Sequence, residues 1–499
     1  MVEKPEKNFN VADTAFAFAA LVIGFLYWNL INSYMLGAGV TVFSIVIFTV
    51  TLIYLTKSGF RQNKGSLICL TLAILSAAQS ALFDNQFISG LNFIFLTATF
   101  IYWICLSTNS RIDNKLSVYI IGDALKQGIA MPFMNFGCCA SGIGKSFSKQ
   151  KKGKGALAAF IGVLIFFPLL VAVIKLLTSA DLAFENFMAG FFDIFSLGKA
   201  ITYIGQFILG IPVAFFLFGL VYGDIKGRYS DRITAKSVDG TAELVKIAPG
   251  ATIYSALTSF NIIYLLFFAV QAVYLFSAFR GDLPGMFTYA EYARRGFFEL
   301  CAVSGINLGV LTLCHLTVKR EKGSEPKPLR TLTIILSLLT ILLIITALSK
   351  MAMYIDVYGL TRLRVYTSWF MVLLLFIFLV ISIRQFKKFN SARIIVAGFI
   401  ILFMVLTYGN VDGKIAKYNI DMYEKGTLKT LDIEALSELS DAAAPYIYEL
   451  YLKTDKKEYY YQWSQLRSIL TDRRIYGDGD FRNFNLQRYK AEMICENLL

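Results

Sequence analysis

The chain has 499 residues, of which 56% are hydrophobic and 16% are charged, and its mean hydropathy is +0.59. A soluble domain is typically about 45–50% apolar and about 25% charged. This composition excludes a disordered chain, a coiled coil and an ordinary cytosolic enzyme. It is typical of a polytopic membrane protein.

A membrane-spanning helix needs about 20 mostly apolar residues, and eleven segments of the chain meet this requirement. The polar N-terminus is followed by a run long enough to span, so we expect a retained first helix rather than a cleaved signal peptide. The predicted fold class is therefore an all-α bundle of about eleven transmembrane helices, at residues 11–31, 38–56, 65–83, 87–107, 155–178, 198–222, 251–278, 297–317, 329–349, 365–383 and 394–409.

The basic stretch 108–154 separates the fourth and fifth predicted spans. Its residues 116–144 are apolar but are interrupted by Pro132 and by glycines and serines. This pattern favours an amphipathic segment that lies on the membrane surface or dips into it. The alternative is a twelfth span, which would invert the orientation of every later helix.

The net charge of +14 predicts the orientation of the chain. With the N-terminus inside, the inner segments hold 27 Lys and Arg residues, and the outer loops that precede residue 410 hold 7. Cytoplasmic loops carry such an excess, so we expect a cytoplasmic N-terminus, an outer C-terminus and a bacterial cytoplasmic (inner) membrane. The basic residues lie between apolar spans, which argues against a nucleic-acid partner.

These features divide the chain into four parts: 1–107 with four spans, 108–154, 155–409 with seven spans, and the tail 410–499. Apolar residues at helical spacing predict a small helical extracytoplasmic tail, with Thr430 or Asp432 capping one helix. The tail also holds an aromatic cluster at 459–463. We expect this cluster to pack in a core or at an interface rather than to stack on carbohydrate.

The sequence contains few of the motifs that indicate an enzyme. It has no convincing nucleotide-binding, hydrolase or protease motif. The single histidine, His315, and seven cysteines without a CxxC pair supply no recognisable set of metal ligands. We therefore expect no cofactor and no metal, and we favour a non-enzymatic function.

Charged and aromatic residues gather in three predicted outer segments: 288–300, 354–366 and 408–420. In the first, Glu291, Arg295 and Glu299 follow at i, i+4 and i+8, so one helical stripe reads acid, base, acid. The candidate ligand-binding residues of the three segments are Tyr289, Glu291, Tyr292, Arg294, Arg295, Glu299, Tyr358, Arg362, Arg364, Asn410 and Asp412.

Two interpretations of these three segments stay open. If they meet, their arginines and tyrosines are suited to clamp a phosphate or a carboxylate. Alternatively, they form a salt-bridge network that seals the loops and seats the tail on the bundle.

Four motifs, NIIYLLFFAVQAVYLF, TYAEYARRGFFEL, YGLTRLR and VDGKIAKYNI, begin at residues 261, 288, 358 and 411. They resemble the bacterial membrane-protein family known as domain of unknown function 4173, a relative of 4153. The resemblance covers roughly 250–440 and implies a polytopic inner-membrane protein. It implies no catalytic residue, and the doubled Arg294 and Arg295 leave open which is the motif arginine.

Three functions follow from these observations. We favour a protein that binds or transports an anionic envelope solute or a lipid headgroup at its outer face. A polar route would use in-span residues, namely Gln79, Gln206, Asn261, Gln271 and Asn307.

The second function is an extracytoplasmic lipid-linked transferase. Enzymes that resemble polyprenyl-sugar transferases usually carry an acid in the first outer loop, and residues 32–37 contain none. The third is a non-catalytic sensor or assembly factor whose tail binds a partner. The expected partners are the lipid bilayer, an anionic lipid or solute, and an envelope protein.

Overall fold

The computed structural model describes residues 9–31, 35–113, 115–148, 173, 176–181, 184, 197–229, 233–280, 289–319, 326–472 and 480–498. Within these ranges the elements are helices, and the one β-type pairing is an isolated bridge between Ala248 and Val318. The predicted all-α fold class is confirmed.

Ten helices among the described residues are long and apolar enough to cross a membrane. They match ten of the eleven predicted spans, whereas the fifth, at 155–178, falls almost wholly outside the described residues. The chain is thus a multi-pass membrane protein. Its span-capable helices are α1 (Val11–Leu30), α2 (Ala38–Lys57), α3 (Lys64–Leu82), α4 (Gln86–Ser107), α10 (Leu197–Ile225), α12 (Gly250–Arg280), α13 (Tyr289–Thr317), α14 (Lys327–Tyr358), α15 (Arg362–Phe386) and α16 (Ser391–Tyr408).

Polar caps fix where these helices begin. Asn10 accepts a hydrogen bond from the Asp13 amide at 2.7 Å, and the Asp13 carboxylate accepts one from the Asn10 amide at 2.8 Å. Such a capping box satisfies two amides that the first turn leaves without a helical partner. Asn63 does the same for α3, and Asn85 caps α4.

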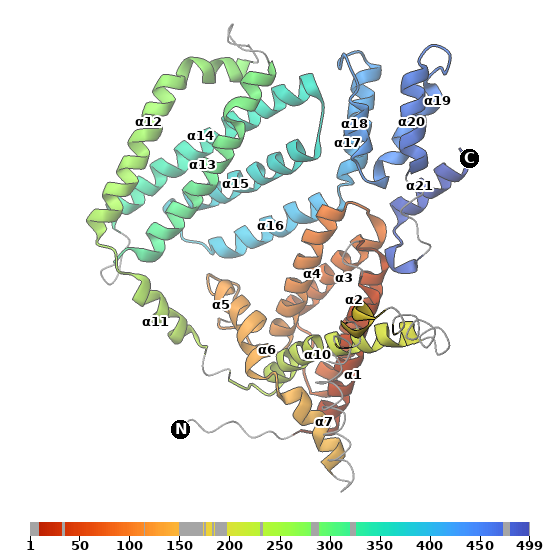
Figure 1. Cartoon of the computed structure of the whole chain (residues 1–499). Helices are drawn as coiled ribbons and strands as arrows, with labels where there is room; N and C mark the ends of the chain where they lie inside the picture. Colours follow the sequence, from red (N-terminus) through yellow and green to blue (C-terminus); the bar gives the residue numbers. More distant parts are fainter. Residues whose placement is uncertain are drawn as a thin grey trace.

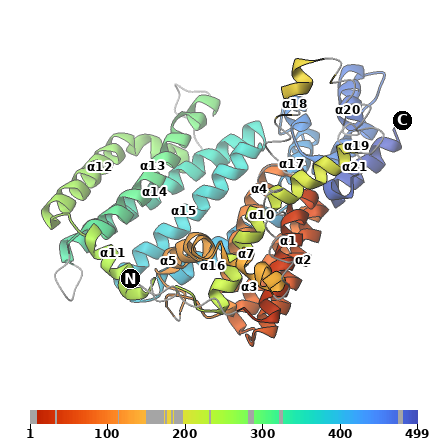
Figure 2. The same cartoon turned by 60° about the horizontal axis from the view of Figure 1, so that its bottom comes forward.

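The described membrane helices pack as two bundles that succeed one another along the chain. The first bundle consists of α1–α4 and α10, and the second consists of α12–α15, each around its own apolar core. The two bundles lie apart over most of their length in both views (Figures 1 and 2), but they touch at the tail side, where the Phe87 ring of α4 stacks on the Tyr366 ring of α15 with ring centres 5.1 Å apart. Helix α16 connects them, since it packs against α15 on one side and α4 on the other.

Glycines allow α1 and α10 to approach closely. Gly24 and Gly210 face each other, and a Cβ atom added to either would overlap the backbone of the other. Helices in a membrane associate through such small residues because no hydrophobic effect drives them together. Helix α10 also contains Pro212, which removes one helical hydrogen bond.

The stretch 116–144 forms short helical pieces at the end of the first bundle opposite the tail (Figure 1). These are α5 (Ile120–Leu125), the π-helical turn η1 (Lys126–Ala130), α6 (Met131–Met134) and the start of α7 (Cys138–Ser148). None of the ten span-capable helices of the described chain falls here. The segment packs against α10 and α1, and its predicted location, on the membrane surface or dipping into it, stays a prediction.

The tail is a helical unit with its own core. It contains α17 (Val411–Glu424), α18 (Ile433–Ser437), α19 (Ala444–Lys453), α20 (Tyr460–Asp472) and α21 (Leu486–Glu496), with two 3-10 turns, η3 (Asp441–Ala443) and η5 (Phe481–Asn483). Asp432 caps α18, as predicted. Of the two expected locations of the aromatic cluster, the core holds only Trp463, which stacks on Tyr451. Residues 459–461 are largely exposed, so packing at an interface stays a prediction for them.

Because α1 and α10 approach closely at Gly210, we expect a methyl group added at this position to destabilise the protein. Gly210→Ala should lower the free energy of unfolding by about 1–3 kcal/mol, because the new Cβ forces the helices apart. Gly205→Ala on the same helix is the control, since its Cβ enters open space. Thermal unfolding of both purified variants measures the difference, and equal stability would contradict the packing.

Candidate functional site

Two of the three predicted outer segments meet where the tail joins the second bundle. Arg362 of α15 forms a two-pronged ion pair with Asp412 of α17, with Nε–Oδ1 at 2.9 Å and Nη2–Oδ2 at 2.6 Å. The Asp412 side chain is fully buried, and its Oδ2 also accepts a hydrogen bond from the Ser440 amide at 3.0 Å. A buried carboxylate needs this set of partners.

Arg364 locks the turn between α14 and α15. It donates hydrogen bonds to the carbonyls of Tyr358 and Gly359, and its guanidinium lies 4.1 Å from the ring centre of Tyr354. Gly359 has a φ of +75°, which favours glycine. Beside it, Asn419 of α17 exchanges two hydrogen bonds with the backbone of residue 360, so this turn is fixed to the tail.

The first predicted segment is described only in part. Residues 289–296 form the first turns of α13, but the side chains of Tyr289, Glu291, Tyr292, Arg294 and Arg295 lie outside the described residues.

Two further candidates are described. Glu299 is exposed on α13 and lies within electrostatic range of Lys350 on α14. Asn410 has a φ of +48°, and its side-chain oxygen accepts a hydrogen bond from Gln487 at 2.8 Å.

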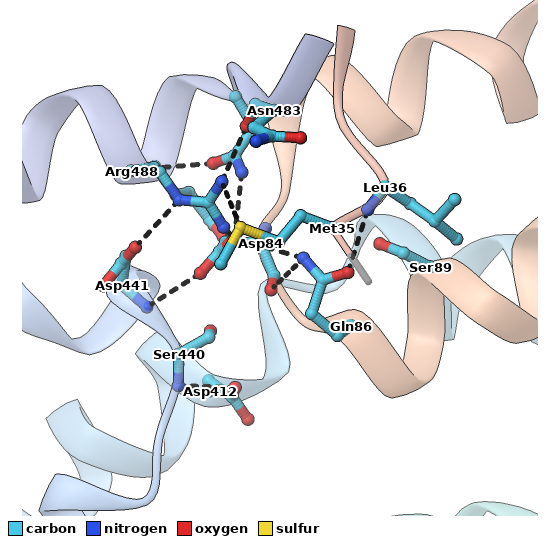
Figure 3. A network of polar contacts seen from close by, with 12 residues as sticks. Met35, Leu36, Asp84, Gln86, Ser89, Asp412, Ser440, Asp441, Asn483 and Arg488 are labelled. Carbon is cyan, nitrogen blue, oxygen red and sulfur yellow. Dashed lines mark hydrogen bonds and ion pairs between the residues drawn. The ribbon is translucent and has the colours of Figure 1, made fainter. Parts of the chain in front are cut away.

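A buried charge cluster that the sequence did not reveal joins the tail to the first bundle. Arg488 of α21 pairs with Asp84, in the short connection between α3 and α4, and its Nε lies 3.5 Å from Asp441 Oδ2 (Figure 3). The three residues are at most 9% exposed. Two carboxylates thus share one guanidinium in a site with little water.

Neighbouring polar groups complete the partners of Asp84. Its Oδ1 accepts a hydrogen bond from Asn485 Nδ2 at 2.9 Å, and its Oδ2 accepts one from the Asp441 amide at 3.3 Å. Its own amide donates to Gln487 at 2.9 Å. The connection between α3 and α4 is therefore enclosed by the tail (Figure 3).

Two consecutive backbone amides of the tail bond to the carboxylates of the two ion pairs. The amide of Ser440 donates to Asp412, which is paired with the second bundle, and the amide of Asp441 donates to Asp84 of the first bundle. The tail consequently fastens both bundles through one peptide segment. This arrangement favours the interpretation that the outer charges seat the tail, rather than that Arg362 and Arg364 clamp a ligand.

The titration of Asp84 follows from this geometry. Burial, and next the negative charge of Asp441, raise the pKa of Asp84 to about 6, although Arg488 and Asn485 act in the opposite direction. The folded protein therefore takes up a proton as the pH falls through 6, whereas the unfolded chain takes it up only near pH 4. Protonation of Asp84 thus stabilises the seated tail more at pH 5 than at pH 7.5.

The first bundle lines an apolar cavity of about 470 Å³ that is open to the outside of the bundle, since its lining residue Phe133 is 61% exposed. Such a volume is within the range of ligand pockets, about 300–1,000 Å³. Its walls come from α1, α2, α4, α10 and the stretch around α6, and the lining residues are Tyr27, Phe43, Ser44, Ile47, Phe48, Phe93, Leu96, Thr97, Phe100, Ile101, Phe133, Phe136, Pro212, Val213, Phe216, Leu217 and Leu220.

The lining of the cavity offers few polar groups to a ligand. The hydroxyls of Ser44 and Thr97 donate to the carbonyls one turn back on their own helices, at 2.7 Å and 2.9 Å. Hydroxyls bonded in this way leave an apolar lining. The cavity therefore suits a hydrocarbon chain better than a polar solute.

A cationic side chain lies near the tail-side end of this cavity. Arg482 Nη1 donates to the carbonyl of Asn29, two residues beyond the cavity residue Tyr27, at 2.9 Å. Its Cβ also approaches Gly39, one turn before Phe43. Arg482 pairs with Asp480, and 36% of its side chain is exposed.

In the described part of the chain, the in-span polar side chains form separate pairs instead of a common route. Gln79 accepts from Asn92 at 2.9 Å in the first bundle, and Asn307 donates to Thr340 at 2.9 Å in the second. Asn261 donates to the carbonyl of residue 332. Such pairs link neighbouring membrane helices. The side chain of Gln271 lies outside the described residues.

Metal chemistry finds no support in the part of the chain that the structure describes. It contains no group of three or more His, Cys, Asp and Glu side chains placed to hold a metal ion. The seven cysteines are present as free thiols, and six of them are buried.

Comparison with known proteins gives one match. A family model described as "Domain of unknown function (DUF4153)" matches residues 67–450, more than three quarters of the chain. This is the relative of family 4173, and the resemblance to 4173 itself stays a prediction. No curated protein sequence and no solved structure matches. The matched range contains Asp84, Asp412 and Asp441, whereas Arg488 lies beyond it.

Removing the guanidinium of the buried cluster should release the tail from the first bundle. Arg488→Leu leaves two carboxylates buried together, so the free energy of opening of α21 should fall by about 3–5 kcal/mol. Hydrogen exchange of the α21 amides measures this energy. Lys490→Leu, at an exposed position on the same helix, is the control, and an equal loss in both variants would rule out a special role for Arg488.

The raised pKa of Asp84 predicts a pH effect with a definite sign. Relative to Asp84→Asn, the wild-type tail should gain about 1 kcal/mol of stability between pH 7.5 and pH 5, because only wild type takes up this proton. The same exchange measurement, corrected for the pH dependence of intrinsic exchange, tests it. A constant difference, or a wild type that weakens on acidification, contradicts the assignment.

Proposed function

The chain belongs to the DUF4153 family of domains of unknown function, and we propose that it binds a lipid with an anionic headgroup in a bacterial cytoplasmic membrane. The hydrocarbon chain of this lipid occupies the cavity of the first bundle, and the headgroup lies at the tail-side, predicted outer, face. One observation carries the proposal: an apolar cavity among span-capable helices has an arginine within about one helical turn of its end.

The lining of the cavity favours lipid over a soluble solute. Ligand sites for polar molecules carry a few convergent polar groups, whereas here the hydroxyls of Ser44 and Thr97 are bonded to their own helices. The in-span amides are also paired with each other or with carbonyls. These contacts support binding of an amphiphile and give no support to a polar transport path.

The charge of Arg482 favours an anionic headgroup. Its guanidinium is partly exposed, and a basic residue near a membrane surface attracts anionic lipid by about 1 kcal/mol. Asp480 neutralises part of this charge, so we expect a preference among lipids rather than an absolute requirement.

The start of α13 provides a second proposed contact for an anionic group. Arg362 and Arg364 already have partners in Asp412 and in backbone carbonyls. Among the arginines of the second bundle, we therefore propose Arg294 and Arg295, rather than Arg362 and Arg364, as ligand contacts.

Filling the cavity should displace the lipid. Thr97→Trp puts an indole into the cavity, whereas Ala98→Trp, one residue on, puts it on an exposed face that does not line the cavity. We expect Thr97→Trp to lose at least about tenfold of the lipid bound to the purified protein, which corresponds to about 1.4 kcal/mol. Native mass spectrometry counts bound lipid, and equal retention in both variants overturns the proposal.

The headgroup preference has its own test. Arg482→Gln should lower the preference for phosphatidylglycerol over phosphatidylcholine by about fivefold, as expected for the loss of about 1 kcal/mol. Arg467→Gln, at an exposed position on α20, is the control and should change nothing. An unchanged preference in Arg482→Gln would remove Arg482 from the site.

A further inference from the structure

We propose that α21 lies on the outer leaflet of the membrane with its exposed apolar face among the lipids. Leu486, Tyr489 and Met493 follow at i, i+3 and i+7 and are 40%, 48% and 49% exposed. Residues at this spacing share one face of a helix. The exposed Lys490 lies on the same face, and a lysine at a membrane surface keeps its stem among apolar groups and its ammonium group in the headgroup layer. The opposite face is buried against the rest of the tail and the first bundle, through Arg488, Ala491 and Cys495.

The turn before α21 extends this exposed face. Phe481 is 58% exposed and Phe484 is 45% exposed, and the ring of Phe484 lies 6.1 Å from that of Tyr489. Single exposed apolar residues are common on soluble surfaces, but clusters of them mark an interaction surface. Five such residues within 481–493 therefore require a partner.

Backbone contacts place this surface at the boundary of the membrane. The amide of Ala38, the first residue of α2, donates to the carbonyl of Phe484 at 2.8 Å. Gly37 permits this approach, because an added Cβ would lie 2.7–2.8 Å from the backbone of 482–484. The end of a spanning helix marks the edge of the hydrocarbon layer, so residues 481–484 lie at that edge.

Two further aromatic residues lie at the same level of the first bundle. Trp28 is 43% exposed. It directly precedes Asn29, whose carbonyl accepts a hydrogen bond from Arg482. Gln206 of α10 lies 3.5 Å from the carbonyl of Trp28, and Tyr203, one turn away, is 51% exposed.

Tryptophan and tyrosine concentrate at membrane interfaces because their rings are apolar with one polar end. The link from Arg482 to Asn29, the residue after Trp28, joins the turn before α21 to this level of α1, and we place the exposed face of α21 in one aromatic belt with Trp28 and Tyr203. This continuity selects the bilayer as its partner.

Site-specific photocrosslinking tests the inference on the full-length protein in vesicles of phosphatidylethanolamine and phosphatidylglycerol. A benzoylphenylalanine replaces Tyr489 in one variant and Tyr461 in the other, a tyrosine of the same tail that is 76% exposed. We expect at least about tenfold more lipid adduct from position 489, detected by mass spectrometry. Equal lipid adducts, or links from position 489 to a second protein chain, overturn the proposal.

A smaller probe covers the case in which the photoreactive group disturbs the turn. A nitroxide attached through Met493→Cys should be more accessible to oxygen, which dissolves in the bilayer, than to a water-soluble nickel chelate. The reverse order places the face in water and rejects the inference. Neither experiment depends on lipid in the cavity, because Tyr489 and Met493 do not line it.

Discussion

Two buried carboxylates, Asp84 and Asp412, hold the tail on the membrane helices. Each has an arginine partner from another element, and each accepts a hydrogen bond from one of the consecutive amides of Ser440 and Asp441. A buried charge without these partners is costly, so the seated tail depends on both arginines and on both amides. The tail in turn closes the connections between α3 and α4 and between α14 and α15. Both the tail and α16 contact the two bundles, which also touch directly through Phe87 and Tyr366.

This constraint explains the shape of the remaining functional surface. Since the charges of the described tail junction are used in seating the tail, we place the proposed ligand site on the lipid-facing side. There the first bundle offers an apolar cavity, with Arg482 near its tail-side end. Phe484, whose ring lies 6.1 Å from that of Tyr489, accepts a hydrogen bond from the first residue of α2, a helix that lines this cavity. A lipid reaches such a site from within the bilayer, which avoids transfer of its hydrocarbon chain through water.

The membrane helices were predictable because local sequence determines them: apolar runs of sufficient length end at caps such as Asn63 and Asn85. The contact between the segments that contain Arg362 and Asp412 was also anticipated, although as one of two alternatives. The pair of Asp84 and Arg488 was not, because 404 residues separate them. Their local signals were weak, namely one acid in a three-residue connection and one arginine on the small-residue face of α21. The cavity depends on the packing of α10 against α1, and no local sequence pattern predicts that packing.

A double-mutant cycle between Arg362 and Arg488 tests most directly whether the tail holds both bundles through residues 440 and 441. The two arginines pair with different carboxylates, Asp412 and Asp84, on different bundles. We expect Arg362→Met and Arg488→Met to be non-additive by at least about 1 kcal/mol in the opening energy of α19, measured by hydrogen exchange, because residues that share a network couple. Additivity within about 0.5 kcal/mol would show two independent contacts and contradict this account.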